Sequence, residues 1–192
     1  MRVVCLISGD GSNLQALIDW QIKGLLGNAE IVGVVSNKAR AFGLERAKRA
    51  NIATTVLSHE RYPNRYQFDR ALMSVIDNYE ADLIVLAGFM RILTAQFVNH
   101  YANRLVNVHP SLLPKYKGLD THRRAIEAGN STAGATVHWV TEDLDSGGII
   151  RQVEVPIYAH DSEESLRQRV LEAEHSLYPA VIRDLSLGVV AC

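Results

Sequence analysis

The sequence contains little cysteine, and its two cysteines are badly placed for a disulfide framework. Cys5 lies within an apolar run near the start, and Cys192 is the last residue. Small secreted domains that depend on disulfides carry many more cysteines at regular spacing. Four metal ligands at the spacing of a zinc finger do not occur either. We therefore expect a cytoplasmic protein whose function requires no metal.

Long apolar runs and an excess of charge are also missing. No apolar run approaches the ~20 residues that a membrane-spanning helix requires. The 20 basic and 21 acidic residues leave a formal net charge of −1, which does not predict a nucleic-acid or membrane surface. The apolar stretch over residues 1–7 is too short for a signal peptide and ends at Gly9. We expect a globular protein that binds neither nucleic acid nor membrane.

The chain has no repeats and no long linker, and apolar runs alternate with amphipathic segments. Apolar residues at helical spacing predict helices over 14–25, 42–50 and 68–79. Predicted strands cover residues 2–7, 31–35, 53–57, 83–87, 104–108, 135–140 and 149–157. This order predicts an α/β fold with a doubly wound, mostly parallel, Rossmann-like sheet and some antiparallel strands in the C-terminal half. We expect one domain over 1–192, with halves at 1–100 and 101–192.

A last helix is predicted to start near residues 161–164, Asp-Ser-Glu-Glu. Asp161 or Ser162 is suited to cap it, because a short polar side chain can accept from the first free N–H groups. Its apolar line continues through Leu177. Proline lacks an N–H, so Pro179 is predicted to end or kink this helix.

A glycine loop links the first predicted strand to the first helix. Residues 8–13 read Ser-Gly-Asp-Gly-Ser-Asn, and such a loop lets free N–H groups at a helix start approach a phosphate. The alternative is a tight turn without a ligand. Leu14 occupies the third glycine position of a dinucleotide fingerprint, and no Lys-Ser/Thr pair follows. The loop therefore favours a single phosphate group.

Asn107 and His109 lie at the end of the apolar run that starts at Leu105, in and just after the predicted strand over 104–108. Residues two apart on a strand point to the same side, and Pro110 closes the strand. An amide that can hold a developing oxyanion, beside an imidazole that can move protons, suits acyl transfer. The alternative is a capping Asn and a structural His. No serine or cysteine lies in a nucleophile elbow, so a covalent hydrolase is not indicated.

Four segments together resemble the formyltetrahydrofolate-dependent formyltransferases. Residues 107–114 (Asn-Val-His-Pro-Ser-Leu-Leu-Pro) are similar to the family's signature, and 143–148 (Asp-Leu-Asp-Ser-Gly-Gly) resemble its aspartate loop. Residues 8–14 resemble the phosphate loop of the branch that acts on phosphoribosylglycinamide, and 87–93 resemble its folate segment. The resemblance therefore extends over nearly the whole chain.

The resemblance implies a role for each matching residue. Asn107, His109 and Asp145 would be catalytic. Glu174 would bind the ribose hydroxyls, and the phosphate would be held by Gly11, Ser12, Asn13 and Leu14. Contacts to the folate would come from Arg65, Met90, Arg91, Ile92, Leu93, Asn107, His138, Val140 and Asp145. From its strand pattern alone, His138 is equally compatible with a buried structural role. Leu171 departs from the family, because some members carry Lys or Gln there.

The resemblance implies transfer of formyl from 10-formyltetrahydrofolate to phosphoribosylglycinamide in purine biosynthesis, by a monomer or homodimer. One alternative is a formyltetrahydrofolate hydrolase, which could use the same trio without a phosphoribosyl site. Another is a formyltransferase acting on a different amine. A transferase acting on tRNA would need a further domain with a basic surface, which 192 residues at a net charge of −1 do not suggest. A nicotinamide dehydrogenase is disfavoured by Leu14.

Overall fold

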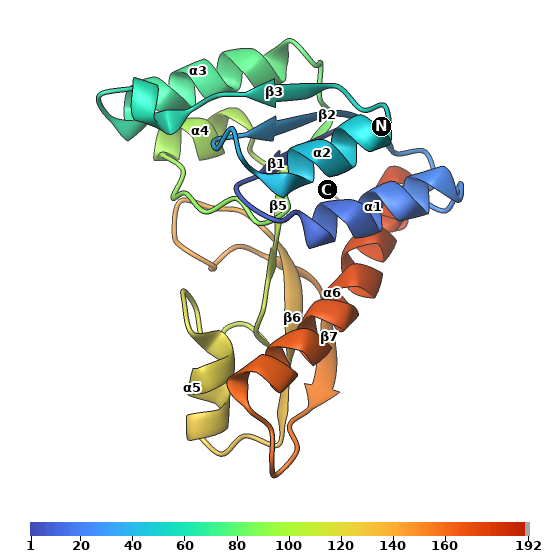
Figure 1. The fold of residues 1–192 in the computed structure, drawn as a ribbon, viewed down its shortest axis with the longest axis vertical. Coiled ribbons are helices and arrows are strands. Elements are labelled where there is room, and N and C mark those ends of the chain that lie inside the picture. Colours follow the sequence, from blue (N-terminus) through green and yellow to red (C-terminus); the bar gives the residue numbers. More distant parts are fainter. Residues whose placement is uncertain (191–192) are drawn as a thin grey trace.

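A computed structural model describes residues 1–190 and contains one seven-stranded sheet (Figure 1). Its strand order is β3-β2-β1-β4-β5-β6-β7. The strands are β1 (Arg2–Ile7), β2 (Glu30–Ser36), β3 (Thr54–Val56), β4 (Leu83–Leu86), β5 (Leu105–His109), β6 (Thr132–Trp139) and β7 (Ile149–Pro156). The pairs from β3 to β5 are parallel, whereas β5–β6 and β6–β7 are antiparallel. The predicted fold class is therefore confirmed. Cys192 lies outside the described residues.

Two helical layers cover the sheet, and the strand β1 shows how the sequence separates them. Its odd residues Val3, Cys5 and Ile7 join one buried cluster, and its even residues Val4 and Leu6 join the other. This alternation is the expected geometry of a strand buried on both faces. The first cluster includes residues of α1 (Ser12–Ile22), α2 (Phe42–Arg49) and α6 (Glu163–Ser186); the second includes residues of α3 (Arg65–Asp77) and α4 (Ala95–His100).

The first helix is shorter than predicted. α1 ends at Ile22, whose side chain is 71% exposed, and Leu25 is 49% exposed. Gly24 lies at φ +68°, in the left-handed region that commonly ends helices. Ile22 and Leu25 keep the helical spacing of apolar residues, but they are exposed and do not belong to the buried face of the helix. Two short helices, α4 and α5 (Thr121–Glu127), were not predicted, because they contain too few turns for a clear periodicity.

The last helix begins as predicted but does not end at Pro179. Ser162 is the N-cap and forms a capping box with Ser165. α6 then continues through Pro179 to Ser186. Tyr178 and Val181, on either side of the proline, are fully buried, so core packing offsets the backbone hydrogen bond that proline removes.

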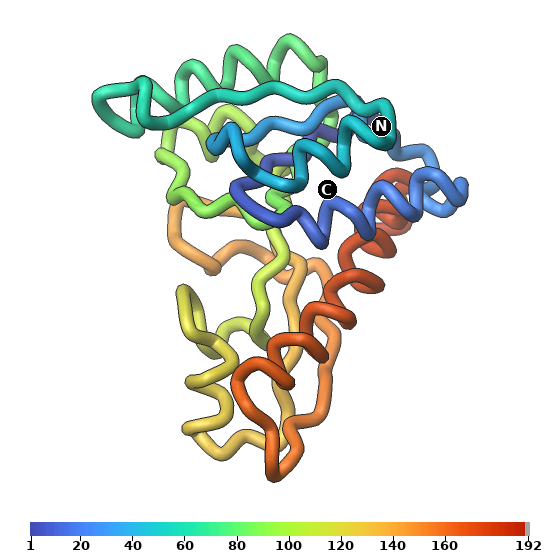
Figure 2. Tube along the Cα trace, viewed as in Figure 1, coloured from blue at the N-terminus to red at the C-terminus, as the bar shows by residue number. Residues whose placement is uncertain are grey.

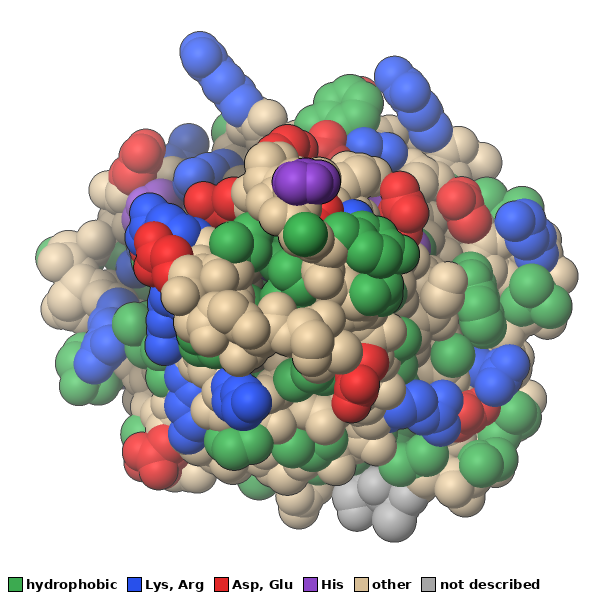
Figure 3. All heavy atoms as spheres, turned by 90° about the horizontal axis from the view of Figure 1, so that it is seen from below, with side chains coloured by type: hydrophobic (Ala, Val, Ile, Leu, Met, Phe, Trp, Pro, Cys, Tyr) green, Lys and Arg blue, Asp and Glu red, His purple; other side chains and the backbone are tan. Residues whose placement is uncertain are grey.

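The path of the chain divides the molecule into an upper and a lower part (Figure 2). The chain from β1 to α4 forms the upper part, β5 leads down from it, and α6 returns from the lower end to the upper part. On the face seen from below, basic and acidic side chains are interspersed (Figure 3), in keeping with the near-neutral composition. Within residues 1–190, no helix is both long and apolar enough to cross a membrane.

Candidate active site

Gly11 shapes the loop between β1 and α1. It is the N-cap of α1 and lies at φ +76°, where glycine is favoured. A Cβ at this position would lie 2.8 Å from the Cα of Gly43, which is too close for any side chain. The N–H of Gly43 donates to the carbonyl of Gly9 at 3.1 Å, so the start of α2 packs directly on the loop. The first-turn N–H groups of α1 have no side-chain cap, as an anion site at a helix start requires.

Arg46 of α2 holds the same loop, a contact that sequence reasoning missed. Its guanidinium donates to the backbone carbonyl of Asp10 at 2.9 Å and to the Asp10 carboxylate at 3.0 Å. A further bond reaches the side chain of Gln15 at 3.2 Å. Arg46 lies in a different helix, and no local spacing in the sequence connects it to the loop.

Asn13 and Glu174 are brought together although they are 161 positions apart. The Asn13 amide donates to the Glu174 carboxyl at 2.7 Å. Glu174, on α6, is only 6% exposed, and its burial raises the pKa to about 7; the hydrogen bond from Asn13 opposes this shift. The side-chain oxygen of Asn13 is buried and has no hydrogen-bond partner within residues 1–190. Asn13 of the predicted phosphate loop and Glu174, the predicted ribose residue, are thus hydrogen-bonded, and the Asn13 oxygen is left as an acceptor for a ligand.

The raised pKa of Glu174 predicts how the stability of the protein depends on pH. The carboxyl binds its proton more tightly in the folded chain than at its ordinary pKa of 4.5, so stability falls as pH rises from about 4.5 to 7. Between pH 5 and 8.5, wild type should lose about 2–3 kcal/mol more unfolding free energy than Glu174→Gln. Urea unfolding at both pH values measures this difference, and the histidines, common to both proteins, cancel.

The exposed neighbour Glu172 provides the matched control for this experiment. Glu172→Gln removes a carboxylate from the same helix without touching the buried pair. Its unfolding free energy should follow that of wild type across the pH range. Parallel curves for wild type and Glu174→Gln would contradict the buried, proton-binding state of Glu174.

The segment after β4 is attached to the glycine loop through Ser8. The Ser8 N–H donates to the carbonyl of Gly88 at 3.1 Å, and the Met90 N–H donates to the Ser8 hydroxyl at 2.8 Å. Met90 and Ile92 are 71% and 63% exposed. Two bulky apolar side chains therefore face outward at the carboxyl end of a central strand, where ligands bind in open α/β sheets.

The other predicted folate residues lie in different settings. Leu93 and Val140 pack against the second buried cluster. The Arg91 guanidinium lies 5.0 Å from the ring centre of Phe68. Arg65 begins α3, is exposed, and lies over the ring of Tyr66 at 5.6 Å. Among the interactions of residues 1–190, none joins Arg65 to the other predicted site residues.

Asn107 faces His138 across the antiparallel pair β5–β6. The two residues are register partners, and the Asn107 amide nitrogen lies 3.3 Å from His138 Nε2. Burial lowers the pKa of His138, opposed by its bond to the Trp139 carbonyl and by the charge of Asp145. A neutral ring that donates from Nδ1 to that carbonyl at 2.8 Å leaves Nε2 as the acceptor for Asn107. His138 thereby orients the Asn107 amide.

His109 and Asp145 form a buried pair with side chains 7% and 8% exposed. His109 Nδ1 lies 3.4 Å from Asp145 Oδ2, and His109 Nε2 lies 2.9 Å from the carbonyl of Tyr116. The ring is therefore hydrogen-bonded to the Tyr116 carbonyl at Nε2 and faces the Asp145 carboxylate at Nδ1. Asp145 also accepts from the Gly118 N–H at 2.9 Å. The three predicted catalytic residues therefore lie close together, since His138, the partner of Asn107, has its Nε2 3.8 Å from Asp145 Oδ1.

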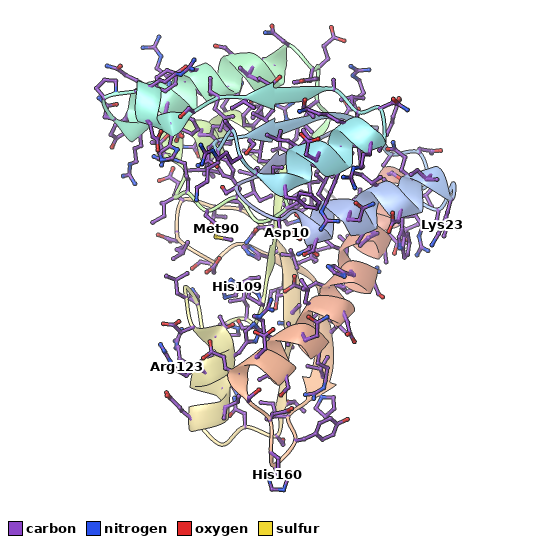
Figure 4. All side chains as sticks on the ribbon, viewed as in Figure 1. Asp10, Lys23, Met90, His109, Arg123 and His160 are labelled. Carbon is purple, nitrogen blue, oxygen red and sulfur yellow. The ribbon has the colours of Figure 1, made fainter. Side chains whose placement is uncertain are left out.

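This arrangement brings an amide donor, an imidazole and a carboxylate together beside the end of β5. Such groups can stabilise an oxyanion and transfer protons. In Figure 4, His109 lies below Asp10 and Met90, so the glycine loop and the segment after β4 stand on the same side of it. Sequence reasoning missed the Tyr116 carbonyl and the Gly118 N–H, because backbone groups leave no signature in residue identity.

Comparisons with known proteins identify relatives over nearly the full chain. A family model described as formyl transferase matches residues 1–182. The phosphoribosylglycinamide formyltransferase of Escherichia coli (strain K12) is 53% identical over 186 residues, covering 95% of this chain and 85% of that protein. The human trifunctional purine biosynthetic protein adenosine-3 is 46% identical over 189 residues, which are 98% of this chain but 19% of that protein.

Solved structures agree with these sequence matches. The structure of the phosphoribosylglycinamide formyltransferase of Coxiella burnetii superposes with a TM-score of 0.94 at 49% identity, covering 98% of this chain and 88% of that one. The glycinamide ribonucleotide transformylase 1 of Symbiobacterium toebii gives the same TM-score at 42% identity, with the same coverage. The fold and the sequence thus point to the same group of proteins.

Proposed function

The chain belongs to the formyl transferase family, and we propose that it transfers the formyl group of 10-formyltetrahydrofolate to the amine of phosphoribosylglycinamide. The resemblance noted in the motifs is confirmed by the family match. The products would be 5-phosphoribosyl-N-formylglycinamide and tetrahydrofolate, in purine biosynthesis. The observation that carries the proposal is the position of the buried His109–Asp145 pair below a glycine loop joined to Glu174. We propose a cytoplasmic enzyme, either a monomer or a homodimer, that acts without a metal.

The phosphoribosyl group would bind to the glycine loop and α6. Free N–H groups of residues 11–13 and the positive end of α1 suit a phosphate, and Leu14 would support the loop from the core. The Glu174 carboxyl and the side-chain oxygen of Asn13, which has no partner among residues 1–190, suit the ribose hydroxyls because they offer buried acceptors.

The folate would lie along the exposed apolar side chains of Met90 and Ile92. A flat pterin suits an apolar wall with backbone polar groups nearby. Arg91, Leu93, His138 and Val140 would complete this wall, and Asp145 and Asn107 would border it. Arg65, at the exposed start of α3, would reach the folate from outside the core.

The proposed chemistry needs no covalent enzyme intermediate. The amine attacks the formyl carbon, and negative charge develops on the formyl oxygen. The Asn107 amide and a cationic His109 would stabilise that charge, while the Asp145 carboxylate stabilises the cation. His109, through the Nδ1 that has only the longer 3.4 Å contact to Asp145, or a water molecule would carry the proton from the amine to the leaving nitrogen. Holding both substrates in line would supply much of the rate enhancement.

An assay with both substrates tests this proposal directly. Tetrahydrofolate should appear only when phosphoribosylglycinamide is present, and formyl should be recovered on its amine. Release of tetrahydrofolate without the amine would instead indicate the hydrolase.

Gly11→Ala should raise the KM for phosphoribosylglycinamide strongly, because its Cβ would collide with Gly43. Gly9→Ala is the matched control, because a Cβ on Gly9 would meet no atom of the described part of the chain within 4 Å.

A further inference from the structure

A short backbone segment, residues 116–119, touches both members of the His109–Asp145 pair. The carbonyl of Tyr116 lies 2.9 Å from His109 Nε2, and the N–H of Gly118 donates to Asp145 Oδ2 at 2.9 Å. The first contact is on the ring nitrogen opposite the pair, and the second is on Oδ2, the carboxylate oxygen that faces His109 Nδ1. The placement of the segment therefore sets the orientation of both groups.

The backbone of the segment is left-handed at two positions, one of which is not a glycine. Tyr116 lies at φ +56° and Gly118 at φ +79°, both in the left-handed region. Asp120, which follows, lies at φ +58° before α5 begins. Asp tolerates this region, but a bulky residue such as Tyr116 adopts it at an energetic cost that surrounding contacts must offset.

Arg124 of α5 supplies such contacts. Its Nη1 donates to the carbonyl of Lys117 at 2.7 Å and to the carbonyl of Leu119 at 3.2 Å. Its guanidinium carbon lies 5.2 Å from the ring centre of Tyr116. One side chain thus contacts residues on both sides of Gly118. Within residues 1–190, Arg124 forms no ion pair with a carboxylate, and its hydrogen bonds go to this segment.

We propose that Arg124 is a positioning residue for the reaction, holding segment 116–119 so that the Tyr116 carbonyl and the Gly118 N–H orient His109 and Asp145. The proposal rests on the proposed function, because it assigns the reaction to that pair. An arginine suits the role, since its planar group can bond two carbonyls and stack on a ring at once. A lysine ammonium could bond a carbonyl of the segment, but it has no planar group to stack on the Tyr116 ring.

The adjacent Arg123 offers a matched control. It is exposed on the same helix and pairs with Asp120 at 2.6 Å, three positions away, rather than with the segment. Arg124→Met keeps the length of the stem but removes both donors. We expect it to lower kcat by about 10-fold, as a small misplacement of catalytic groups does, with both KM values within about 2-fold. The kcat of Arg124→Lys should fall between those of Arg124→Met and wild type, and the kcat of Arg123→Met should match that of wild type.

Coupling to the catalytic pair separates positioning from a general structural role. In an Asp145→Asn background, Arg124→Met should cause little further loss of kcat, because residues that act as a unit are non-additive. An equal 10-fold loss in both backgrounds would overturn the proposal. So would a kcat for Arg124→Met that equals the kcat of Arg123→Met.

Hydrogen exchange at the Gly118 amide tests, without any substrate, whether Arg124 holds segment 116–119 in place. The exchange rate of this amide should rise about 10-fold in Arg124→Met and stay unchanged in Arg123→Met, because release of the segment weakens the bond from Gly118 to Asp145. Unchanged exchange in Arg124→Met would overturn the proposal. If wild type fails to transfer formyl while the exchange result holds, the proposed function fails and the bracing of Asp145 by Arg124 stands.

Discussion

His109→Ala is expected to lower kcat by about 10²–10⁴-fold, the range typical of a lost proton-transfer group or oxyanion donor. The KM for each substrate should change little, because the interaction strengthens mainly in the transition state. Both ring nitrogens of His109 face protein oxygens, at 3.4 Å and 2.9 Å, so the ring is held in place before the reaction. Steady-state kinetics with each substrate varied in turn measures the effect.

His160→Ala is the control for this experiment. His160 is exposed at the lower tip of the molecule, well below His109 in Figure 4. Its removal should therefore leave kcat unchanged. The His109→Ala/Asp145→Asn double variant should be little worse than the worse single variant. Near-normal kcat in His109→Ala would make His109 structural and would refute its proposed role.

Gly147→Ala is expected to lower kcat by about 10²-fold, the effect of displacing a catalytic group by about 1 Å. A Cβ on Gly147 would lie 1.7 Å from the carbonyl oxygen of Trp139 and 2.7 Å from its carbonyl carbon. Backbone atoms cannot move aside as a flexible side chain can, so the loop must shift. Asp145 lies two residues earlier on this loop and would move with it, which would change its 3.4 Å contact with His109.

The neighbouring glycine gives a closely matched comparison. A Cβ on Gly148 would lie 3.6 Å from Trp139 Cδ1, which is an ordinary contact, so Gly148→Ala should retain activity. Thermal unfolding of both variants shows whether each is folded under the assay conditions. If folded Gly147→Ala is as active as Gly148→Ala, then the close packing of this loop on β6 does not position Asp145.

The strands and most helices were predictable because their signals are local. Buried parallel strands such as β4 are continuous apolar runs, and α3 has a clear helical spacing of apolar residues. The errors arose where local rules compete with packing. Apolar spacing past Ile22 suggested a longer helix, and Pro179 suggested an end or a kink, whereas the helix continues through it against the buried core.

Parts of the site were also accessible from the sequence. The side-by-side placement of Asn107 and His109 follows from the two-residue period of a strand, and the glycine loop follows from the need for a left-handed turn before α1. Asp145 and Glu174 entered only through the resemblance to a family. No physical argument from spacing connects either residue to positions 36 or 161 residues earlier.

The tertiary structure decided which distant groups meet. The order of strands in the sheet and the antiparallel return of β6 place His138 opposite Asn107, and α6 carries Glu174 back to Asn13. Contacts between the Tyr116 carbonyl, the Gly118 N–H and the His109–Asp145 pair depend on backbone groups that every residue shares. Arg124 reaches this segment only because α5 packs beside it, so a surface arginine and a positioning arginine look identical until the chain is folded.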